Sequence, residues 1–174
     1  MSATLPQPLQ QQAALPPPTP GQIIQNHQKT APVDVLAIAR NLGLNVWGMH
    51  SLSPNISGKI FRDPLNGGTS GFSIAVNPFE AFVRQRFTVA HEIAHFILHR
   101  HLLEAKGTLA DDTMYRSGLS TAEETAANRL AATILMPFPL IQSVIASGIN
   151  DVNSLANRFQ VSQIAMKIRL GIPT

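Results

Sequence analysis

Three residues in one short stretch have the types and the spacing of a metal-dependent hydrolase. His91, Glu92 and His95 form a His-Glu-x-x-His string. Residues four apart on an α-helix lie about 6 Å apart along its axis and about 40° around it, so both imidazoles can bind one metal ion. Glu92 is rotated by about 100° from His91, which suits a carboxylate that takes a proton from a water molecule. The string predicts a metal centre with Glu92 as the general base.

The alternative is a core helix that carries two histidines with ordinary hydrogen-bond partners. Such a helix would also have to bury the carboxylate of Glu92 without a partner, which is costly. The residues around the string are uncharged, as expected of a helix buried around a site. His99 lies about 12 Å from His91 along a continuous helix, too far to share a metal ion, and we expect His99 and His101 to be helix-end residues.

The third metal ligand is expected from another helix, where Glu123 and Glu124 are both available. Ser120 and Glu123 have the spacing of a capping box, which would turn Glu123 back onto the start of the helix. Glu124 lies one turn before Asn128, whose amide could orient the Glu124 carboxylate. We therefore favour Glu124 as the ligand, although Thr121 and Glu124 also have capping-box spacing.

The segments on either side of the string predict an α+β fold. In this fold, a small antiparallel sheet packs on the helix that carries the string. Three segments rich in β-forming residues are expected to be its strands: 44–49, 56–62 and 71–76. The Asn-Gly-Gly of residues 66–68 supplies the positive φ angles that a loop between paired strands needs. Asn77 and Pro78 are expected to open the metal-binding helix, which runs to about His101.

Apolar periodicity and capping residues predict five further helices. They are expected at 33–42, 120–136, 139–147, 151–159 and 162–170. The first thirty residues are different, because they are rich in Pro and Gln and the first twenty-eight carry no charged side chain. Too few bulky apolar groups are present there to offset the entropy of ordering, so we expect residues 1–30 to be disordered.

The composition excludes several classes of protein. The 174 residues include no cysteine, which rules out disulfide scaffolds and zinc fingers and leaves His, Asp and Glu as metal ligands. The apolar stretches are interrupted before the roughly 18 residues that a membrane-spanning helix needs. The N-terminus lacks the positive start and the apolar centre of a secretion signal. We therefore expect a cytoplasmic protein that does not contact a membrane.

The C-terminal part offers a rival function. The formal net charge of +3 lies entirely in residues 129–174. Four basic residues there face one acidic residue: Arg129, Arg158, Lys167 and Arg169 against Asp151. Residues 155–165 have the outline of a helix-turn-helix, which favours a DNA-associated regulator without protease activity. The apolar spacing equally describes two small helices packed on a larger body, with Leu155, Phe159, Ile164 and Ile168 as the packing residues. Direct DNA binding is therefore the less favoured interpretation.

The sequence also resembles the ImmA/IrrE family of zinc metallopeptidases over about residues 33–172. Three stretches carry the likeness: RQRFTVAHEIAH at 84–95, ETAAN at 124–128 and AATILMP at 131–137. In that family the two motif histidines and a glutamate four residues before the Asn bind zinc, and the motif glutamate acts as the base. The resemblance therefore implies that His91, His95 and Glu124 bind zinc (Zn2+) and that Glu92 is the base. The same ligands also accept manganese, cobalt or iron.

The composition and the resemblance together predict three parts of the chain, and the resemblance implies a function. The parts are a disordered tail (1–30), a zincin-like metallopeptidase domain (31–148) and a helix-turn-helix-like pair packed on it (149–174). Family members typically cleave, or relieve repression by, a partner helix-turn-helix repressor, and many are encoded in phage, mobile-element or toxin-antitoxin operons. We thus expect a zinc endopeptidase whose protein substrate is such a repressor or an antitoxin. The alternative is a zinc-containing regulator or toxin-antitoxin component that binds protein or DNA without proteolysis.

Peptide hydrolysis also needs a group that stabilises the oxyanion. Tyr115, the only tyrosine, is one candidate, with Arg116, Arg84 and Arg86 as alternatives. The substrate is expected to bind as an extended segment against the strand at 71–76, which precedes the metal-binding helix.

Overall fold

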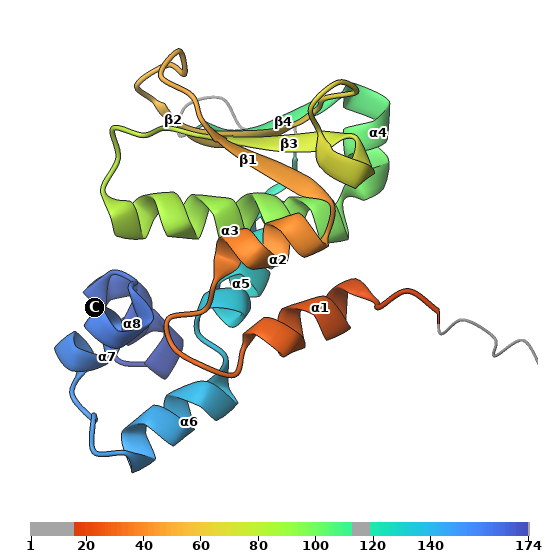
Figure 1. Ribbon diagram of the computed structural model, residues 1–174. Coiled ribbons are helices and arrows are strands. Elements are labelled where there is room, and N and C mark those ends of the chain that lie inside the picture. The colour runs from red at the N-terminus through yellow and green to blue at the C-terminus, as the bar shows by residue number, and fades with distance from the viewer. Residues whose placement is uncertain (1–15, 113–118, 174) are drawn as a thin grey trace, which may run out of the picture.

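A four-stranded sheet covers one side of the long helix α3, and most of the other helices lie on the opposite side (Figure 1). The computed structural model describes residues 16–112 and 119–173, with the backbone alone at 109–112. The fold is α+β, as the sequence predicts. The elements are α1 (Pro20–His27), α2 (Val35–Asn41), β1 (Leu44–Gly48), β2 (Ile56–Arg62), the 3-10 turn η1 (Gly68–Ser70), β3 (Phe72–Val76), α3 (Phe82–Leu98), α4 (Arg100–Lys106), β4 (Thr108–Asp112), α5 (Thr121–Leu135), α6 (Phe138–Ala146), α7 (Val152–Phe159) and α8 (Gln163–Leu170).

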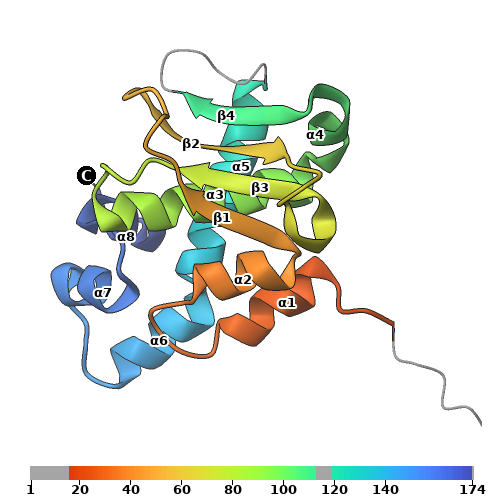
Figure 2. The ribbon, with the colours of Figure 1, turned by 45° about the horizontal axis from the view of Figure 1, so that its top comes forward.

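The sheet has the strand order β1-β3-β2-β4, which Figure 2 shows from above. β2 pairs antiparallel with β3 and with β4, whereas β1 pairs parallel with β3. The sheet is therefore mixed, and the predicted antiparallel pairing holds for two of its three strand pairs. β2 lies between β1 and β3 in the sequence and runs antiparallel to both, so the chain reverses direction before β2 and again after it. In the sheet, β2 lies on the far side of β3 from β1. β4 is not among the predicted strands, since its sequence TLADD has few β-forming residues.

The connection between β2 and β3 depends on glycine, as the sequence predicts. Gly68 has a φ of +61°, where a side chain would be strained. A Cβ at Gly68 would also lie 2.4 Å from the carbonyl oxygen of Gly43. This loop therefore packs closely on the residue that precedes β1.

Helix α3 lies along the inner face of the sheet and forms the centre of the core. Its apolar residues Val89, Ile93 and Phe96 are buried in one cluster with Ile60 and Ile74 from the sheet. α3 therefore packs against the sheet on one face and against α5 on another.

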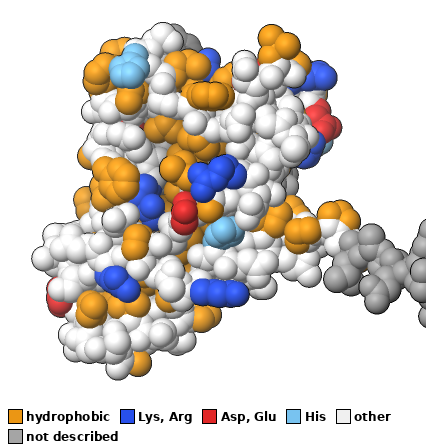
Figure 3. Space-filling model, viewed as in Figure 1, with side chains coloured by type: hydrophobic (Ala, Val, Ile, Leu, Met, Phe, Trp, Pro, Cys, Tyr) orange, Lys and Arg blue, Asp and Glu red, His pale blue; other side chains and the backbone are white. Residues whose placement is uncertain are grey.

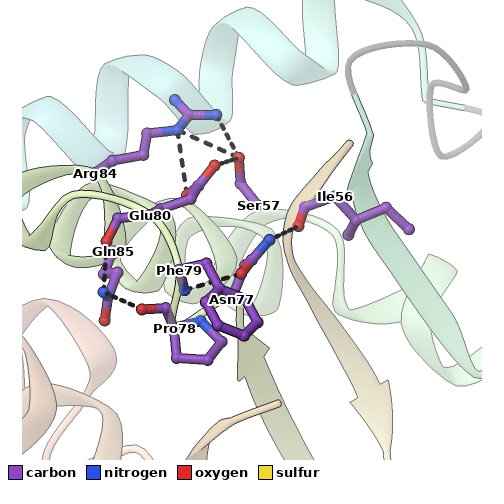
Figure 4. A network of polar contacts seen from close by, with 8 residues as sticks. All are labelled: Ile56, Ser57, Asn77, Pro78, Phe79, Glu80, Arg84 and Gln85. Carbon is purple, nitrogen blue, oxygen red and sulfur yellow. Dashed lines mark hydrogen bonds and ion pairs between the residues drawn. The ribbon is translucent and has the colours of Figure 1, made fainter. Parts of the chain in front are cut away.

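Helix α3 begins later than the sequence predicts, at Phe82 with Ala81 as its N-cap residue. Asn77 does not cap it. Its Oδ1 accepts a hydrogen bond from the backbone N–H of Phe79 (3.0 Å), and its Nδ2 donates to the carbonyl oxygen of Ile56 (3.3 Å; Figure 4). Asn77 instead closes a turn between β3 and α3 and ties that turn to β2.

Gly58 on β2 allows the sheet to approach α3 closely. A Cβ at this position would lie 2.4 Å from Cγ2 of Thr88 and 2.8 Å from the carbonyl oxygen of Ala75. We expect Gly58→Ala to lower the free energy of unfolding by about 1–3 kcal/mol, because the sheet and α3 must move apart. Urea unfolding measures this difference.

Gly21→Ala is the matched control for this prediction. Gly21 lies in α1, and a Cβ there would meet no atom within 4 Å. Its replacement is expected to leave the stability unchanged or slightly raised. Equal effects of the two substitutions would contradict the close approach of β2 and α3.

Three of the four helices that follow residue 119 start at the predicted residues, and α6 starts at Phe138, one residue before the predicted start. Ser120, Asp151 and Ser162 are the N-cap residues of α5, α7 and α8, and each accepts a hydrogen bond from the backbone N–H three residues later. Pro137 separates α5 from α6. Leu155, Phe159 and Met166 belong to the same apolar core as the sheet, so α7 and α8 pack on the rest of the molecule. The packing predicted for Ile164 and Ile168 is wrong, because these side chains are 64% and 66% exposed.

One stretch of the described chain, Thr121–Ala146, is long and apolar enough to cross a membrane by length and composition. In the structure it consists of two helices, α5 and α6, because the backbone leaves the helical conformation at Met136 (φ −132°, ψ 63°). The longer of them has 15 residues. That is shorter than the roughly 20 residues of a typical transmembrane helix.

The expectation of disorder over 1–30 is wrong for the segment that forms α1. Thr19 and Gln22 form a capping box, and Pro20 lies at the first helical position. Ile23 and Ile24 are buried in the core. The two isoleucines supply the apolar contacts that the Pro-rich composition does not reveal, whereas residues 1–15 lie outside the described part of the chain.

Candidate metal centre

Two helices bring the three predicted metal ligands together. His91 and His95 lie one turn apart on α3, and Glu124 lies in the first turn of α5. The Nε2 atoms of the two histidines are 2.8 Å apart. Oε2 of Glu124 is 3.4 Å from Nε2 of His91 and 3.7 Å from Nε2 of His95. Potential ligand atoms of all three residues thus lie within 4.8 Å of one another.

The geometry of this cluster fits a metal ion. Zinc bonds to imidazole nitrogen and carboxylate oxygen are about 2.0–2.2 Å long, so neighbouring ligands of a tetrahedral ion are about 3.4 Å apart. The two distances to Glu124 are close to this value, and the two imidazoles would separate slightly. Two nitrogens and one oxygen are also a donor set that catalytic zinc sites use, with a fourth position for water or substrate. The residues present therefore fit the ion that the sequence predicts.

Burial prepares the histidines for metal binding. His91 and His95 are only 3% and 2% exposed. Burial and the neighbouring His91 lower the pKa of His95 to about 3, although the carboxylate of Glu124 acts in the opposite direction. His95 is therefore neutral at pH 7, and a neutral imidazole is the form that binds metal.

The structure separates the two adjacent glutamates. Ser120 and Glu123 form a capping box, in which the backbone N–H of Ser120 donates to the Glu123 carboxylate over 2.6 Å. This hydrogen bond lowers the pKa of Glu123. Glu123 is thus turned toward the start of α5, while Glu124 faces the histidines. The capping-box alternative for Thr121 and Glu124 is wrong, because α5 begins one residue too early for it.

His99 has a role that the sequence did not reveal. Its Nδ1 lies 3.0 Å from Nδ1 of His95, and the residue is 6% exposed. When Nε2 of His95 carries no proton, its Nδ1 carries one, and this N–H donates a hydrogen bond to Nδ1 of His99. His99 therefore orients the imidazole of His95 and does not itself bind the metal. It ends α3, as predicted for a helix-end residue.

We expect His99→Ala to weaken zinc binding by about 10–100-fold, the loss typical of a partner that orients a metal-binding histidine. Competition with a chromogenic chelator measures the dissociation constant. His101→Ala is the control, because His101 is exposed and lies on α4. Unchanged zinc affinity of His99→Ala would show that the hydrogen bond to His95 has no part in metal binding.

Glu92, the predicted base, is fully buried on α3 beside His91. Of the predicted oxyanion-stabilising groups, Tyr115 and Arg116 lie outside the described residues. Arg86 is a structural residue, because its guanidinium donates to backbone carbonyl oxygens before α2 and after α7. Desolvation by burial lowers its pKa.

Arg84 lies nearer to the metal-binding face of α3. Its Nη2 donates to Oγ of Ser57 (2.9 Å), and its Nε is 3.8 Å from Oε2 of Glu80 (Figure 4). The hydroxyl of Ser57 in turn donates to Oε1 of Glu80 (2.7 Å). This network holds the guanidinium at the start of α3, two turns before His91.

The predicted substrate position along β3 is wrong. β3 is an interior strand whose backbone groups pair with β1 on one side and β2 on the other. It therefore has no free edge for another strand. The edges of the sheet are β1 and β4, and a sequence pattern alone does not reveal which strands are interior.

Comparisons with known proteins show the family of this chain. The sequence matches the profile of the IrrE N-terminal-like domain, peptidase family M78, over residues 39–171. A search of curated proteins gives no match. A solved structure with a similar fold is a Mycobacterium tuberculosis transcriptional regulator, with a TM-score of 0.57 and 16% identity, covering 86% of this chain and 47% of the regulator. This chain thus spans about half the length of that protein. Because the family profile covers most of its sequence, the chain belongs to the IrrE N-terminal-like domain family of peptidases.

Proposed function

We propose that this protein is a zinc-dependent endopeptidase that hydrolyses a peptide bond of a partner protein. The observation that carries the proposal is the convergence of His91, His95 and Glu124 within 4.8 Å, with Glu92 on the same helix as the two histidines. Membership of a peptidase family supports the reaction class.

When bound, zinc would polarise the carbonyl group of the substrate and lower the pKa of a water molecule. Glu92 accepts a proton from that water molecule and later donates it to the nitrogen of the leaving amine. His99 keeps the imidazole of His95 in the tautomer that binds the ion. Arg84 is placed to contact the substrate rather than the reacting bond, because it lies two turns before His91.

The proposed substrate is a helix-turn-helix repressor or an antitoxin. The family relation and the fold shared with a transcriptional regulator support a link to gene regulation. β4 is an edge strand of the sheet and offers backbone groups to an extended substrate segment, the role expected earlier of β3.

A regulator that acts without proteolysis is the second candidate, because α7 and α8 form a compact helix pair with a helix-turn-helix outline. The side chains that α8 exposes include Ile164 and Ile168, which are 64% and 66% exposed. Apolar side chains of this size suit a protein contact better than phosphate groups. On the face that Figure 3 shows, Lys and Arg side chains are dispersed among apolar ones rather than gathered into one patch.

The test uses the zinc-loaded full chain and candidate helix-turn-helix proteins encoded beside its gene. We expect one of them to be cut into two fragments whose masses add up to the intact protein plus one water molecule, and a chelator to abolish the cut. If a partner protein binds and loses its DNA-binding activity while its mass stays unchanged, the proposal fails and the regulator without proteolysis gains support.

A further inference from the structure

A groove of about 810 Å³ lies between α3, α5 and α8, beside the metal centre. Most of its wall is apolar, with Phe87 from α3 and the exposed Ile164 and Ile168 from α8. The volume is in the range of sites that hold a ligand, and the exposed isoleucines lose contact with water only when something fills the groove.

The groove adjoins the metal centre through residues next to the metal ligands. The ring of Phe87 stacks on that of His91, with ring centroids 6.4 Å apart and planes 25° apart. On the facing helix, Thr125 and Asn128 line the groove and follow Glu124 by one and four residues. The groove therefore begins next to the metal ligands, although none of the three ligands lines it.

The charged side chains that line the groove are all arginines, although Arg84 lies 3.8 Å from a carboxylate oxygen of Glu80, which is not a lining residue. Arg84, Arg129 and Arg169 line the groove, one from each of the three helices, and no Asp or Glu is among its described lining residues. Arg169 is fixed, because its Nε donates to the carbonyl oxygen of Met136 and its guanidinium lies 4.0 Å from the ring centre of Phe138. Apolar walls with a cationic rim are complementary to an apolar segment that carries a carboxylate.

We propose that this groove binds a segment of the protein substrate next to the cleaved bond and selects segments with bulky apolar side chains and an Asp or Glu. This inference rests on the proposed peptidase function, but it concerns binding and can be tested without hydrolysis. Ile164 and Ile168 contact the apolar side chains, and Arg129 contacts the carboxylate. The helix-turn-helix-like pair is then a part of the substrate site.

The first probe is a library of random peptides displayed on phage and selected on the full chain carrying Glu92→Gln, so that bound peptides are not cut. We expect the selected peptides to be rich in Leu, Ile or Phe together with Asp or Glu. For a selected peptide, Ile164→Asp and Arg129→Glu are each expected to raise the dissociation constant by about tenfold or more, the loss typical of a central contact in an interface. Fluorescence anisotropy measures these constants.

Two control variants make the matching kinds of change outside the groove, an apolar side chain to Asp and an arginine to Glu. Leu65→Asp changes a side chain that is 92% exposed in the β2–β3 loop, and Arg158→Glu changes the exposed outer side of α7. Neither is expected to alter peptide binding. A peptide in which Lys replaces the acidic residue should regain affinity for Arg129→Glu, because the charge pair is restored with opposite signs.

Several results would overturn the inference. These are a library that yields no binding peptide, selected peptides without an acidic residue, and binding that Ile164→Asp leaves unchanged. Random-sequence duplex DNA is the second probe. If Arg129→Glu abolishes binding of the duplex and Ile164→Asp does not affect it, the groove is assigned to nucleic acid. If peptides bind as expected but none of the tested proteins is cleaved, the peptide selectivity of the groove stands, whereas the peptidase proposal and the cleaved bond beside the groove fail.

Discussion

Glu92→Gln is expected to lower kcat for peptide hydrolysis by about 10²–10⁴-fold, the contribution typical of a general base, and to leave zinc binding unchanged. Gln has the shape of Glu but accepts no proton at neutral pH. Glu92 does not belong to the cluster of potential ligands, so its replacement should leave all three in place. Steady-state cleavage of a protein substrate, together with the zinc content of the purified variant, measures both effects.

Glu104→Gln is the control for this experiment. It makes the same chemical change on α4, where Glu104 is exposed and pairs with Arg100 over 2.9 Å. Its kcat is expected to match that of the wild type. A Glu92→Gln variant that binds zinc and retains the wild-type kcat would show that another group takes the proton, and the mechanism proposed for Glu92 would be wrong.

The second large effect is expected on metal binding, from two adjacent residues with different roles. Glu124→Ala removes the only ligand that α5 supplies to the cluster and should weaken zinc binding by more than about 100-fold, since changes at residues that merely orient a ligand cost 10–100-fold. Glu123→Ala should leave zinc affinity unchanged, because that carboxylate caps α5. Isothermal titration of the metal-free variants with zinc gives both constants.

Circular dichroism separates a lost ligand from a lost helix. Glu123→Ala removes half of the capping box and is expected to destabilise the start of α5 slightly. Glu124→Ala leaves the box intact, so its helix content should equal that of the wild type. Loss of zinc affinity in Glu123→Ala, with Glu124→Ala unaffected, would exchange the roles of the two residues.

The sequence predicts local features of the site well because they depend on residues close together in the chain. The His-Glu-x-x-His spacing alone places His91 and His95 on one side of a helix. Capping chemistry at Ser120 correctly favours Glu124 over Glu123 as the residue that faces the histidines. The strands β1 to β3 also follow from runs of β-forming residues.

Features that depend on tertiary contacts could not be predicted in the same way. The burial of Ile23 and Ile24 is a property of the folded core, which the Pro-rich composition around them conceals. The interior position of β3 results from the order in which strands pair, which no single strand encodes. The contact of His99 with His95 depends on the ring orientation of both residues at the end of α3. Each of these three features depends on how whole helices and strands are arranged in the fold, which the local sequence does not specify.

Anomalous diffraction at the zinc absorption edge, from crystals of the zinc-loaded full chain, tests the central claim most directly. The account predicts one strong peak within about 2.0–2.2 Å of Nε2 of His91, Nε2 of His95 and a carboxylate oxygen of Glu124. A zinc-loaded crystal with no peak between these three side chains, or with its peak at other ligands, would contradict the metal centre and the hydrolase built on it.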